Sequence, residues 1–273
     1  MVGRDHGAPS SLNEDTNMAT LKRFFALAGF AAAVVSGFPA HASVTIEGTR
    51  VVYPSDAKEV TIKLNNNEKR PSLVQVWLDT ANQDAGPGKA DVPFVLMPPV
   101  SRIDAGKSQT LRLSYTGEPL AKDKETLFWL NVLDIPPKAK ATSDDSAGNE
   151  ARLNFAFRTR IKVFFRPTGL PFPVTDAPAK LQWKLVLADK GKGYAFEVSN
   201  PTPYHVSFSS ISLKVGDRTF TSLENKGMVA PNGTERFPGM ADVTAKPGSG
   251  AKVVFEVIND YGGKQTVEAP LSP

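Results

Sequence analysis

Residues 153–167 read L-N-F-A-F-R-T-R-I-K-V-F-F-R-P, and this stretch is the most informative part of the chain. Its odd-numbered positions are apolar apart from Thr159, and its even-numbered positions are mostly polar and include the cations Arg158, Arg160, Lys162 and Arg166. Because successive side chains of a strand point to opposite faces, this alternation predicts a long β-strand with one apolar face and one cationic face. Pro167 has no backbone N–H to donate to a neighbouring strand, so the strand is expected to end there.

Short runs of apolar and β-branched residues recur on both sides of this strand, with turn-forming residues between them. They cover residues 44–47, 60–64, 73–78, 94–97, 109–113 and 127–132 before it, and 181–187, 194–198, 206–208, 212–215 and 253–257 after it. Regularly spaced short strands are typical of β-sandwiches. A length of 273 residues allows two domains. We therefore predict an all-β protein, with domains at 43–167 and 181–273 and a linker rich in Pro and Gly at 168–180.

The first 42 residues have the organisation of a secretory signal peptide. Lys22 and Arg23 precede an apolar run at residues 24–35, and Ala40-His41-Ala42 supplies a small-x-small cleavage site. Met18 lies just before this signal, so residues 1–17 are interpreted as an over-called start. We expect an exported protein whose mature form begins near Ser43.

The composition limits the chemistry of this exported protein. It contains no cysteine, which excludes thiol catalysis and zinc–thiolate sites. His205 is the single histidine that follows the predicted cleavage site, so a histidine-rich metal site or a histidine-based triad is not expected. The net charge of +4 suits an anionic ligand but is too small to indicate nucleic-acid binding. No cofactor or metal is predicted.

Six motifs of the chain occur together in one known family. They are T-R-V-V-Y-P at 49–54, M-P-P-V-S-R-I-D-A-G at 97–106, L-A-K-D-K-E-T-L-F-W-L-N-V-L-D-I-P-P at 120–137, R-I-K-V-F-F-R-P at 160–167, N-P-T-P-Y at 200–204 and N-D-Y-G-G at 259–263. In this order behind a secretion signal, they resemble the periplasmic chaperones that assemble pili and fimbriae by the chaperone–usher route. The resemblance covers the whole mature chain. It implies two immunoglobulin-like β-sandwich domains in an L-shaped arrangement.

The resemblance also implies a function and its partners. A member of this family binds, folds and caps pilus subunits in the periplasm by donor-strand complementation, and delivers them to an outer-membrane usher. In that mechanism an edge strand completes the unfinished fold of the subunit. Self-association through the same exposed strand is a further expectation, because an unpaired apolar edge is adhesive.

The family's functional residues match particular positions of this sequence. Arg50 and Lys162 match the two cations that anchor the C-terminal carboxylate of a pilin subunit. Leu153, Phe155 and Phe157 match the alternating apolar residues of the donor strand.

Three further charged residues match a bridge between the two domains of the family. They are Glu125, Arg166 and Asp260, and the resemblance implies that they hold the interdomain angle. The sequence alone leaves open that Glu125 is an ordinary solvated surface charge. Pro98 matches a proline that follows a cis peptide bond.

Two other classes of function compete with the chaperone. A secreted glycosidase would need two carboxylates, yet Asp144 and Asp145 lie in a polar surface loop, and Glu47, Asp104 and Glu125 show no special spacing. An adhesin, a pilin or a carbohydrate-binding structural protein could use the same β-sandwich fold. A pilin, however, would carry an N-terminal donor extension, whereas here the expected mature chain enters a strand almost at once. We therefore predict a binding protein without enzymatic activity.

Overall fold

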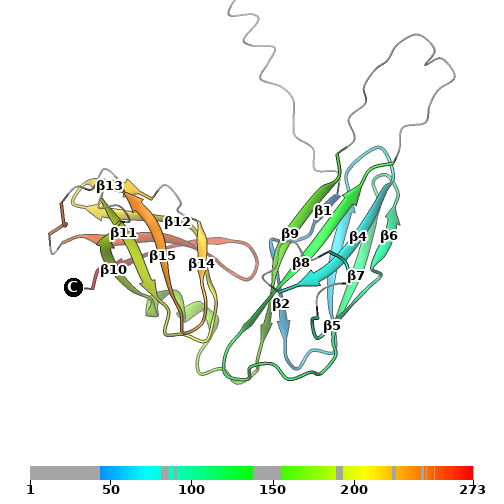
Figure 1. Cartoon of the computed structure of the whole chain (residues 1–273), viewed down its shortest axis with the longest axis horizontal. Helices are drawn as coiled ribbons and strands as arrows, with labels where there is room; N and C mark the ends of the chain where they lie inside the picture. Colours follow the sequence, from blue (N-terminus) through cyan, green and yellow to red (C-terminus); the bar gives the residue numbers. More distant parts are fainter. Residues whose placement is uncertain are drawn as a thin grey trace, which may run out of the picture. The chain divides into compact units, whose positions relative to one another are not determined.

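The computed structural model describes residues 44–80, 86–88, 91–137, 155–188, 193–222, 226–240, 243, 245–248 and 250–272. The predicted signal peptide and Leu153 lie outside the described residues. Apart from two short 3₁₀ turns, the regular elements within these ranges are β-strands, and Figure 1 shows them in two groups, β1–β9 and β10–β17. The all-β prediction is confirmed.

The first group of strands precedes the Pro- and Gly-rich segment. Its members are β1 (Val44–Ile46), β2 (Arg50–Pro54), β3 (Val60–Asn66), β4 (Ser72–Asp79), β5 (Phe94–Met97), β6 (Val100–Ile103), β7 (Ser108–Tyr115), β8 (Thr126–Ile135) and β9 (Phe157–Arg166). They form one sheet in the order β1-β3-β7-β5 and a second in the order β2-β9-β8-β4-β6. The peptide bond between Met97 and Pro98 is cis, as the family resemblance implies.

Inward-facing residues of both sheets make a single core in this first domain. Leu111 and Leu113 of one sheet and Val74, Leu130 and Val163 of the other are fully buried in one cluster. Burial alternates along β3 and β7, as is typical of a β-sandwich, in which two sheets pack face to face. The apolar positions identified in the sequence therefore form the interior of the domain.

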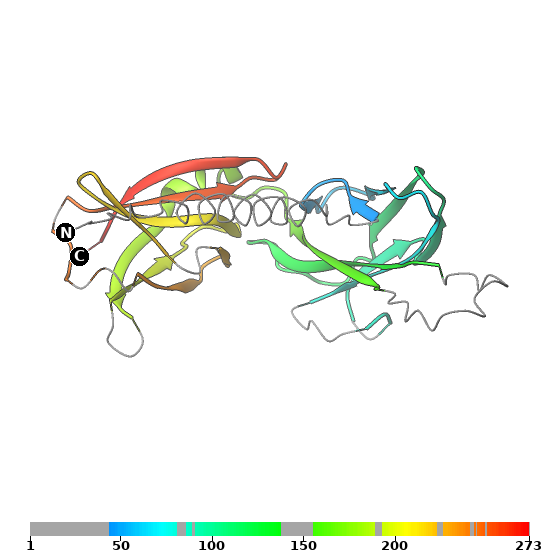
Figure 2. The same ribbon diagram turned by 90° about the horizontal axis from the view of Figure 1, so that it is seen from above.

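The second domain is also a β-sandwich. Its strands are β10 (Gln182–Leu187), β11 (Tyr194–Ser199), β12 (Val206–Val215), β13 (Arg218–Thr221), β14 (Gly227–Val229), β15 (Thr234–Met240), β16 (Lys252–Ile258) and β17 (Lys264–Pro270). A sheet of order β10-β11-β15 faces one of order β13-β12-β16-β17, in which β14 also pairs with β12. Figure 2 shows the strands of this domain in two layers. Trp183, Phe196 and Phe255 are fully buried between them.

The core of the second domain extends into the segment expected to be a linker. Two 3₁₀ turns, η2 (Val174–Asp176) and η3 (Pro178–Lys180), lie there. Ala177, between the two turns, is fully buried in the second core. The ring of Phe172 packs against that of Tyr204, with their centroids 5.8 Å apart. The second half of this segment is therefore part of the second domain.

Several strands differ from the prediction. The residues expected as two strands at 206–208 and 212–215 form the single strand β12, which has an irregular register near Phe208. The expected strand at 153–167 is β9, which begins at Phe157. Phe164, at an even position, is buried although the pattern placed it on the cationic face. The strands β2, β6, β13, β14, β15 and β17 were not predicted, because their short or polar sequences lack a clear alternation.

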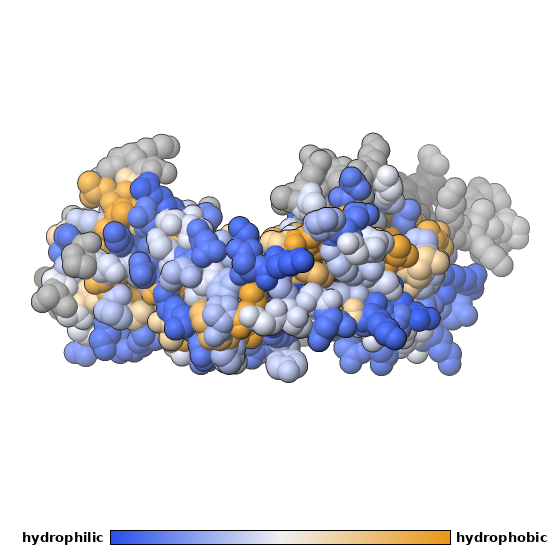
Figure 3. Space-filling view, turned by 90° about the horizontal axis from the view of Figure 1, so that it is seen from below, coloured by the Kyte–Doolittle hydropathy of each residue, from blue (hydrophilic) through white to orange (hydrophobic). Residues whose placement is uncertain are grey.

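The outer surface differs in character from these two cores. On the face drawn in Figure 3, hydrophilic residues cover most of the surface and the hydrophobic patches are small and separate. Within the described part of the chain, no helix has the length and hydrophobicity needed to cross a membrane.

The buried core generates a stability prediction. Leu130→Ala removes a fully buried side chain and leaves a cavity, so the free energy of unfolding should fall by about 2–5 kcal/mol. Leu187→Ala is the matched control, because Leu187 is 66% exposed. Urea unfolding followed by tryptophan fluorescence measures both changes. Equal losses in the two variants would contradict the assignment of Leu130 to the core.

Candidate functional site

The strands β2 and β9 place two cations beside each other. These strands pair in parallel, with Arg50 directly opposite Lys162 and Pro54 opposite Arg166. The pairing begins at Arg50, the first residue of β2, so the two cations lie where β2 starts to pair with β9. The structure thus brings together the two residues that the sequence resemblance associates with a carboxylate.

Lys162 is held by a residue of the second domain. Its Nζ atom donates a hydrogen bond of 2.9 Å to the hydroxyl of Ser207, a buried residue of β12. Burial and, secondarily, the neighbouring charge of Arg50 lower the pKa of Lys162 to about 8. Burial disfavours the charged form of this lysine, so an anion bound beside it would stabilise that charged form.

Arg50 also reaches the second domain. Its Nη1 atom donates to the carbonyl oxygen of Ile258 at 2.8 Å. Its Nε atom is buried and has no hydrogen-bond partner among the described residues. Burial lowers the pKa of Arg50, and the charge of Asp260 partly offsets that effect. Arg50 therefore keeps a buried donor available beside Lys162.

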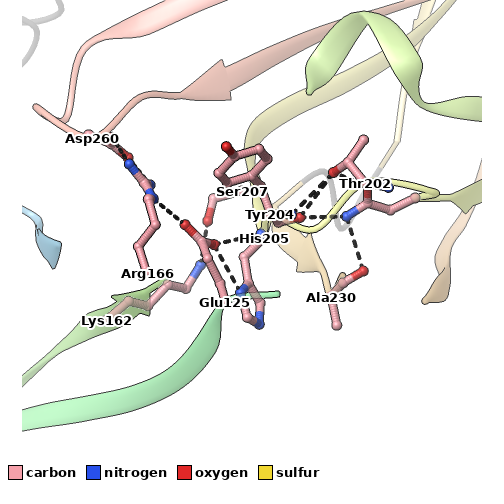
Figure 4. A network of polar contacts seen from close by, with 10 residues as sticks. Glu125, Lys162, Arg166, Thr202, Tyr204, His205, Ser207, Ala230 and Asp260 are labelled. Carbon is pink, nitrogen blue, oxygen red and sulfur yellow. Dashed lines mark hydrogen bonds and ion pairs between the residues drawn. The ribbon is translucent and has the colours of Figure 1, made fainter. Parts of the chain in front are cut away.

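A second charged cluster lies four residues further along β9. The Nε atom of Arg166 is 2.7 Å from Oε1 of Glu125, and its Nη1 and Nη2 atoms are 2.6 and 2.9 Å from the two carboxylate oxygens of Asp260 (Figure 4). Burial disfavours the Arg166 charge, but the hydrogen bonds and charges of Asp260 and Glu125 outweigh this and raise its pKa above the usual arginine value. The sequence-predicted triplet is thus in direct contact.

The Glu125 carboxylate is almost completely enclosed, with a side chain only 1% exposed. Its Oε2 atom accepts from the backbone N–H of His205 at 2.8 Å and lies 3.2 Å from Nδ1 of the same residue. The ring of His205 also stacks on Phe164, with centroids 5.3 Å apart. Interpreting Glu125 as a solvated charge is therefore wrong: it is buried, and three donors surround it.

Two turns of the second domain carry the residues that contact Glu125 and Arg166. In N-P-T-P-Y, the Asn200 side chain donates to the carbonyls of Tyr204 and Ala230 and accepts from Thr202, which locks the turn that leads into His205. The carbonyl of Pro203 in this turn accepts from the backbone of Glu125 at 2.9 Å.

The other turn, N-D-Y-G-G, carries Asp260. The Asn259 side chain accepts from the backbone N–H groups of Tyr261 and Gly263. Gly262 has φ +83°, and a Cβ there would lie 2.8 Å from Oγ1 of Thr49 in the first domain. A glycine is therefore required where this turn approaches the start of β2.

The first half of β9 leaves one edge open. β8 pairs with β9 from Phe157 to Phe165, but β2 pairs only with residues 162–166. Among the described strands, none covers the other edge of residues 157–161. Phe155 and Phe157 are 58% and 52% exposed, and their rings lie 6.4 Å apart. Leu153, the third predicted donor residue, lies outside the described residues.

The two other cations on this face of β9 are engaged by their own domain. Arg160 pairs with the fully buried Asp79 and lies 4.3 Å above the Trp129 ring. Arg158 donates to Asn131 at 2.7 Å and lies over the ring of Trp77. Among the described carboxylates, by contrast, none forms an ion pair with Lys162 or Arg50.

Comparison with known proteins identifies the family. The model of the pili and flagellar-assembly chaperone PapD N-terminal domain matches residues 43–171, and that of the pili assembly chaperone PapD C-terminal domain matches residues 176–269. The probable fimbrial chaperone YadV of Escherichia coli is 45% identical over 223 residues, which cover 81% of this chain and 87% of YadV. The chain belongs to the PapD family of pilus-assembly chaperones.

Solved structures agree with this assignment. The crystal structure of the Pseudomonas aeruginosa CupB2 chaperone has a TM-score of 0.68 and 38% identity, over 84% of this chain and 100% of that one. The SafB chaperone of Salmonella enterica, in complex with the SafA pilin, has a TM-score of 0.64 and 28% identity, over 86% of this chain and 99% of that one. The expected fold of two PapD-like β-sandwich domains and the expected chaperone class are both confirmed.

Sequence reasoning missed three parts of this chaperone's site. His205 was noted only for its chemistry, and neither Ser207 nor the carbonyl of Ile258 was identified. His205 directly follows the N-P-T-P-Y motif, Ser207 comes two residues later, and Ile258 directly precedes N-D-Y-G-G. Their position next to two recognised turns was the available signal. Within the described ranges, no three His, Cys, Asp or Glu side chains gather to hold a metal ion.

The enclosed carboxylate generates a second stability prediction. Arg166→Ala removes the cation that compensates the buried charge of Glu125, so the chaperone should lose about 3–5 kcal/mol of unfolding free energy. Arg102→Ala is the control: its ion pair with Asp104 is exposed, and its removal should change stability little. Thermal or urea unfolding distinguishes the two variants. A wild-type stability for Arg166→Ala would show that the carboxylate does not depend on this partner.

Proposed function

We propose that this chaperone binds, folds and caps pilus subunits by lending them β9 as a missing strand, with Arg50 and Lys162 anchoring the subunit's C-terminal carboxylate. The observation that carries the proposal is the half-open edge of β9, which ends at two cations that have no carboxylate partner among the described residues. An unpaired strand edge offers backbone donors and acceptors to another chain.

The two cations decide the direction of the added strand. A strand placed beside residues 157–161 continues the line of β2 and meets Arg50 and Lys162 at one end. An N-terminal ammonium at that end would be repelled, whereas a C-terminal carboxylate would be attracted. The subunit strand therefore runs parallel to β9, and it spans about 17 Å from Phe157 to Lys162 at roughly 3.3 Å per residue.

The exposed rings supply the apolar contacts of this proposal. Phe155 and Phe157 alternate along the chain and are more than half exposed, so they can fill the groove of an incomplete subunit. Leu153 continues the same alternation in the sequence. The same edge could pair with a second copy of the chaperone, and self-association stays a prediction.

The anchor is suited to a carboxylate on chemical grounds. Arg50 keeps a buried Nε–H that has no acceptor in the described part of the chain, and Lys162 offers further donors besides the one bonded to Ser207. Hydrogen bonds between such cations and a carboxylate contribute about 1.5–3 kcal/mol each. Together they would set the register of the added strand, because its last residue must reach both cations.

The remaining elements of the proposal concern the pathway. Fimbrial chaperones of this family are periplasmic, and residues 1–42 have the pattern of a cleavable signal, so we place this chaperone in the periplasm. A pilin partner is supported by the similar SafB chaperone, whose structure contains a bound pilin. Delivery to an outer-membrane usher and the absence of enzymatic activity complete the proposal. The relatives are named chaperones, which disfavours the adhesin alternative.

The anchor generates a binding prediction. Lys162→Ala and Arg50→Ala should each weaken binding of a cognate pilin by about 100-fold or more, because removing one cation leaves the carboxylate partly uncompensated. Co-purification of a pilin from periplasmic extracts, followed by titration, measures the effect. Lys184→Ala, at an exposed position of the second domain, is the control. Unchanged pilin binding by both anchor variants would refute the anchor.

The donor strand generates a separate prediction. Phe157→Glu should weaken pilin capture strongly, because it would place a carboxylate in an apolar groove. The stability of the free chaperone should change little, since Phe157 is 52% exposed. Leu187→Glu tests for a general effect of a new charge on an exposed strand. Equal pilin capture by the two variants would remove β9 from the mechanism.

A further inference from the structure

We propose that Ser207 of the second domain is a third member of the carboxylate anchor: its hydroxyl fixes the Lys162 ammonium and donates its own hydrogen to the bound carboxylate. This inference rests on the proposed function, since it concerns the same anion. It extends that function, because it makes the second domain part of the binding site rather than a support for it.

The first step is the contact between Ser207 and Lys162. The hydroxyl oxygen accepts from Nζ at 2.9 Å, and Ser207 is 2% exposed. A lysine side chain has a flexible four-carbon stem, so an ammonium without a fixed acceptor samples many positions. The Trp129 ring, 5.9 Å from Nζ, offers only a weak additional contact. Ser207 is therefore the group that defines where the ammonium lies.

The second step concerns the hydrogen of the hydroxyl. A serine hydroxyl has one donor and two acceptor positions. Ser207 uses an acceptor position for Lys162, and its hydrogen is donated to no acceptor among the described residues. A buried donor without a partner is unfavourable, and a carboxylate beside Lys162 would satisfy it.

The third step is the location of this hydroxyl relative to Arg50. Ser207 and Arg50 both line a cavity of about 160 Å³, whose wall also carries Arg166 with its two carboxylate partners, Glu125 and Asp260. Lys162 is not part of this wall and is reached through Ser207. Because Lys162 is bonded to Ser207 and pairs in register with Arg50, donors from three strands converge on one place. These donors are an ammonium, a guanidinium and a hydroxyl, which together suit the oxygens of one carboxylate.

The fourth step explains why Ser207 is held in position. The ring of His205, two residues earlier in the chain, packs against the ring of Phe164. The backbone N–H of His205 donates to the buried carboxylate of Glu125. Along β9, Lys162 contacts Ser207, Phe164 packs against His205, and Arg166 pairs with the Glu125 that His205 binds. Figure 4 shows Lys162 beside Ser207 and Arg166 beside Glu125. Strand β9 and residues 205–207 thus contribute to both the interdomain charge bridge and the carboxylate anchor.

The experiment uses the mature chaperone and a peptide of alternating valine and serine that ends in a free carboxylate, with its C-terminal amide as reference. The Ser207→Thr and Ser207→Val variants carry side chains of nearly the same shape, but only the threonine side chain has a hydroxyl. We expect the valine variant to bind the free acid about tenfold more weakly than the threonine variant. The amide should bind both variants equally. Ser209→Ala, which lies on the same strand and contacts Glu256, should behave as wild type.

A pH titration gives a second readout. The Ser207 hydroxyl accepts a hydrogen bond from Lys162 and thereby favours the charged form of the lysine. Loss of this hydroxyl should therefore lower the pKa of Lys162 further below the value of about 8 in the wild type. The affinity of the valine variant for the free acid should therefore decline at a lower pH than that of the threonine variant. A purely structural role of Ser207 would not move this midpoint.

The outcomes separate the two proposals. Equal affinities and equal pH midpoints for the threonine and valine variants, with Lys162→Ala still selectively losing the free acid, would overturn the role of Ser207 and leave the anchor standing. Equal binding of acid and amide by the wild type and by Lys162→Ala would overturn the anchor itself.

Discussion

The buried ion pair between Glu125 and Arg166 is the constraint on which the arrangement of the site depends. A carboxylate that is 1% exposed is costly unless it is compensated. Arg166 on the neighbouring strand β9 supplies the opposite charge, and the turn before β12 supplies the backbone N–H of His205. Asp260 accepts from both Nη atoms of the same guanidinium. The requirement to satisfy one buried network therefore holds four segments together: the start of β8, strand β9, the turn before β12 and the turn between β16 and β17.

The strand β9 serves three purposes with one alternating pattern. Val163 and Phe165 bury their side chains in the first core, while Lys162 and Arg166 bind Ser207 and Asp260 of the second domain. Phe157, at the other end, is exposed because β2 does not extend along that half of the strand. A slip of one residue would move every side chain to the opposite face, so the same register that packs the core also aims the cations.

Much of the fold could be predicted from the sequence, because alternation is a local property. The strands with buried alternating residues, such as β3, β7 and β8, were predicted within a few residues. Strand β17 was missed since its residues are polar and partly exposed, as befits an edge strand. Ser207 was missed for another reason: its partner lies 45 residues away in sequence, and no local pattern records that contact.

The sequence by itself determined the class of fold, the order of the strands with clear alternation, and a set of motifs that resemble one family. These features depend on neighbouring residues along the chain, and so they can be read without coordinates. Only the tertiary structure decided that Glu125 is buried, that Phe164 packs on His205 and that Ser207 holds Lys162. Burial and hydrogen bonding depend on which distant segments meet, and the free energy of the whole fold decides that.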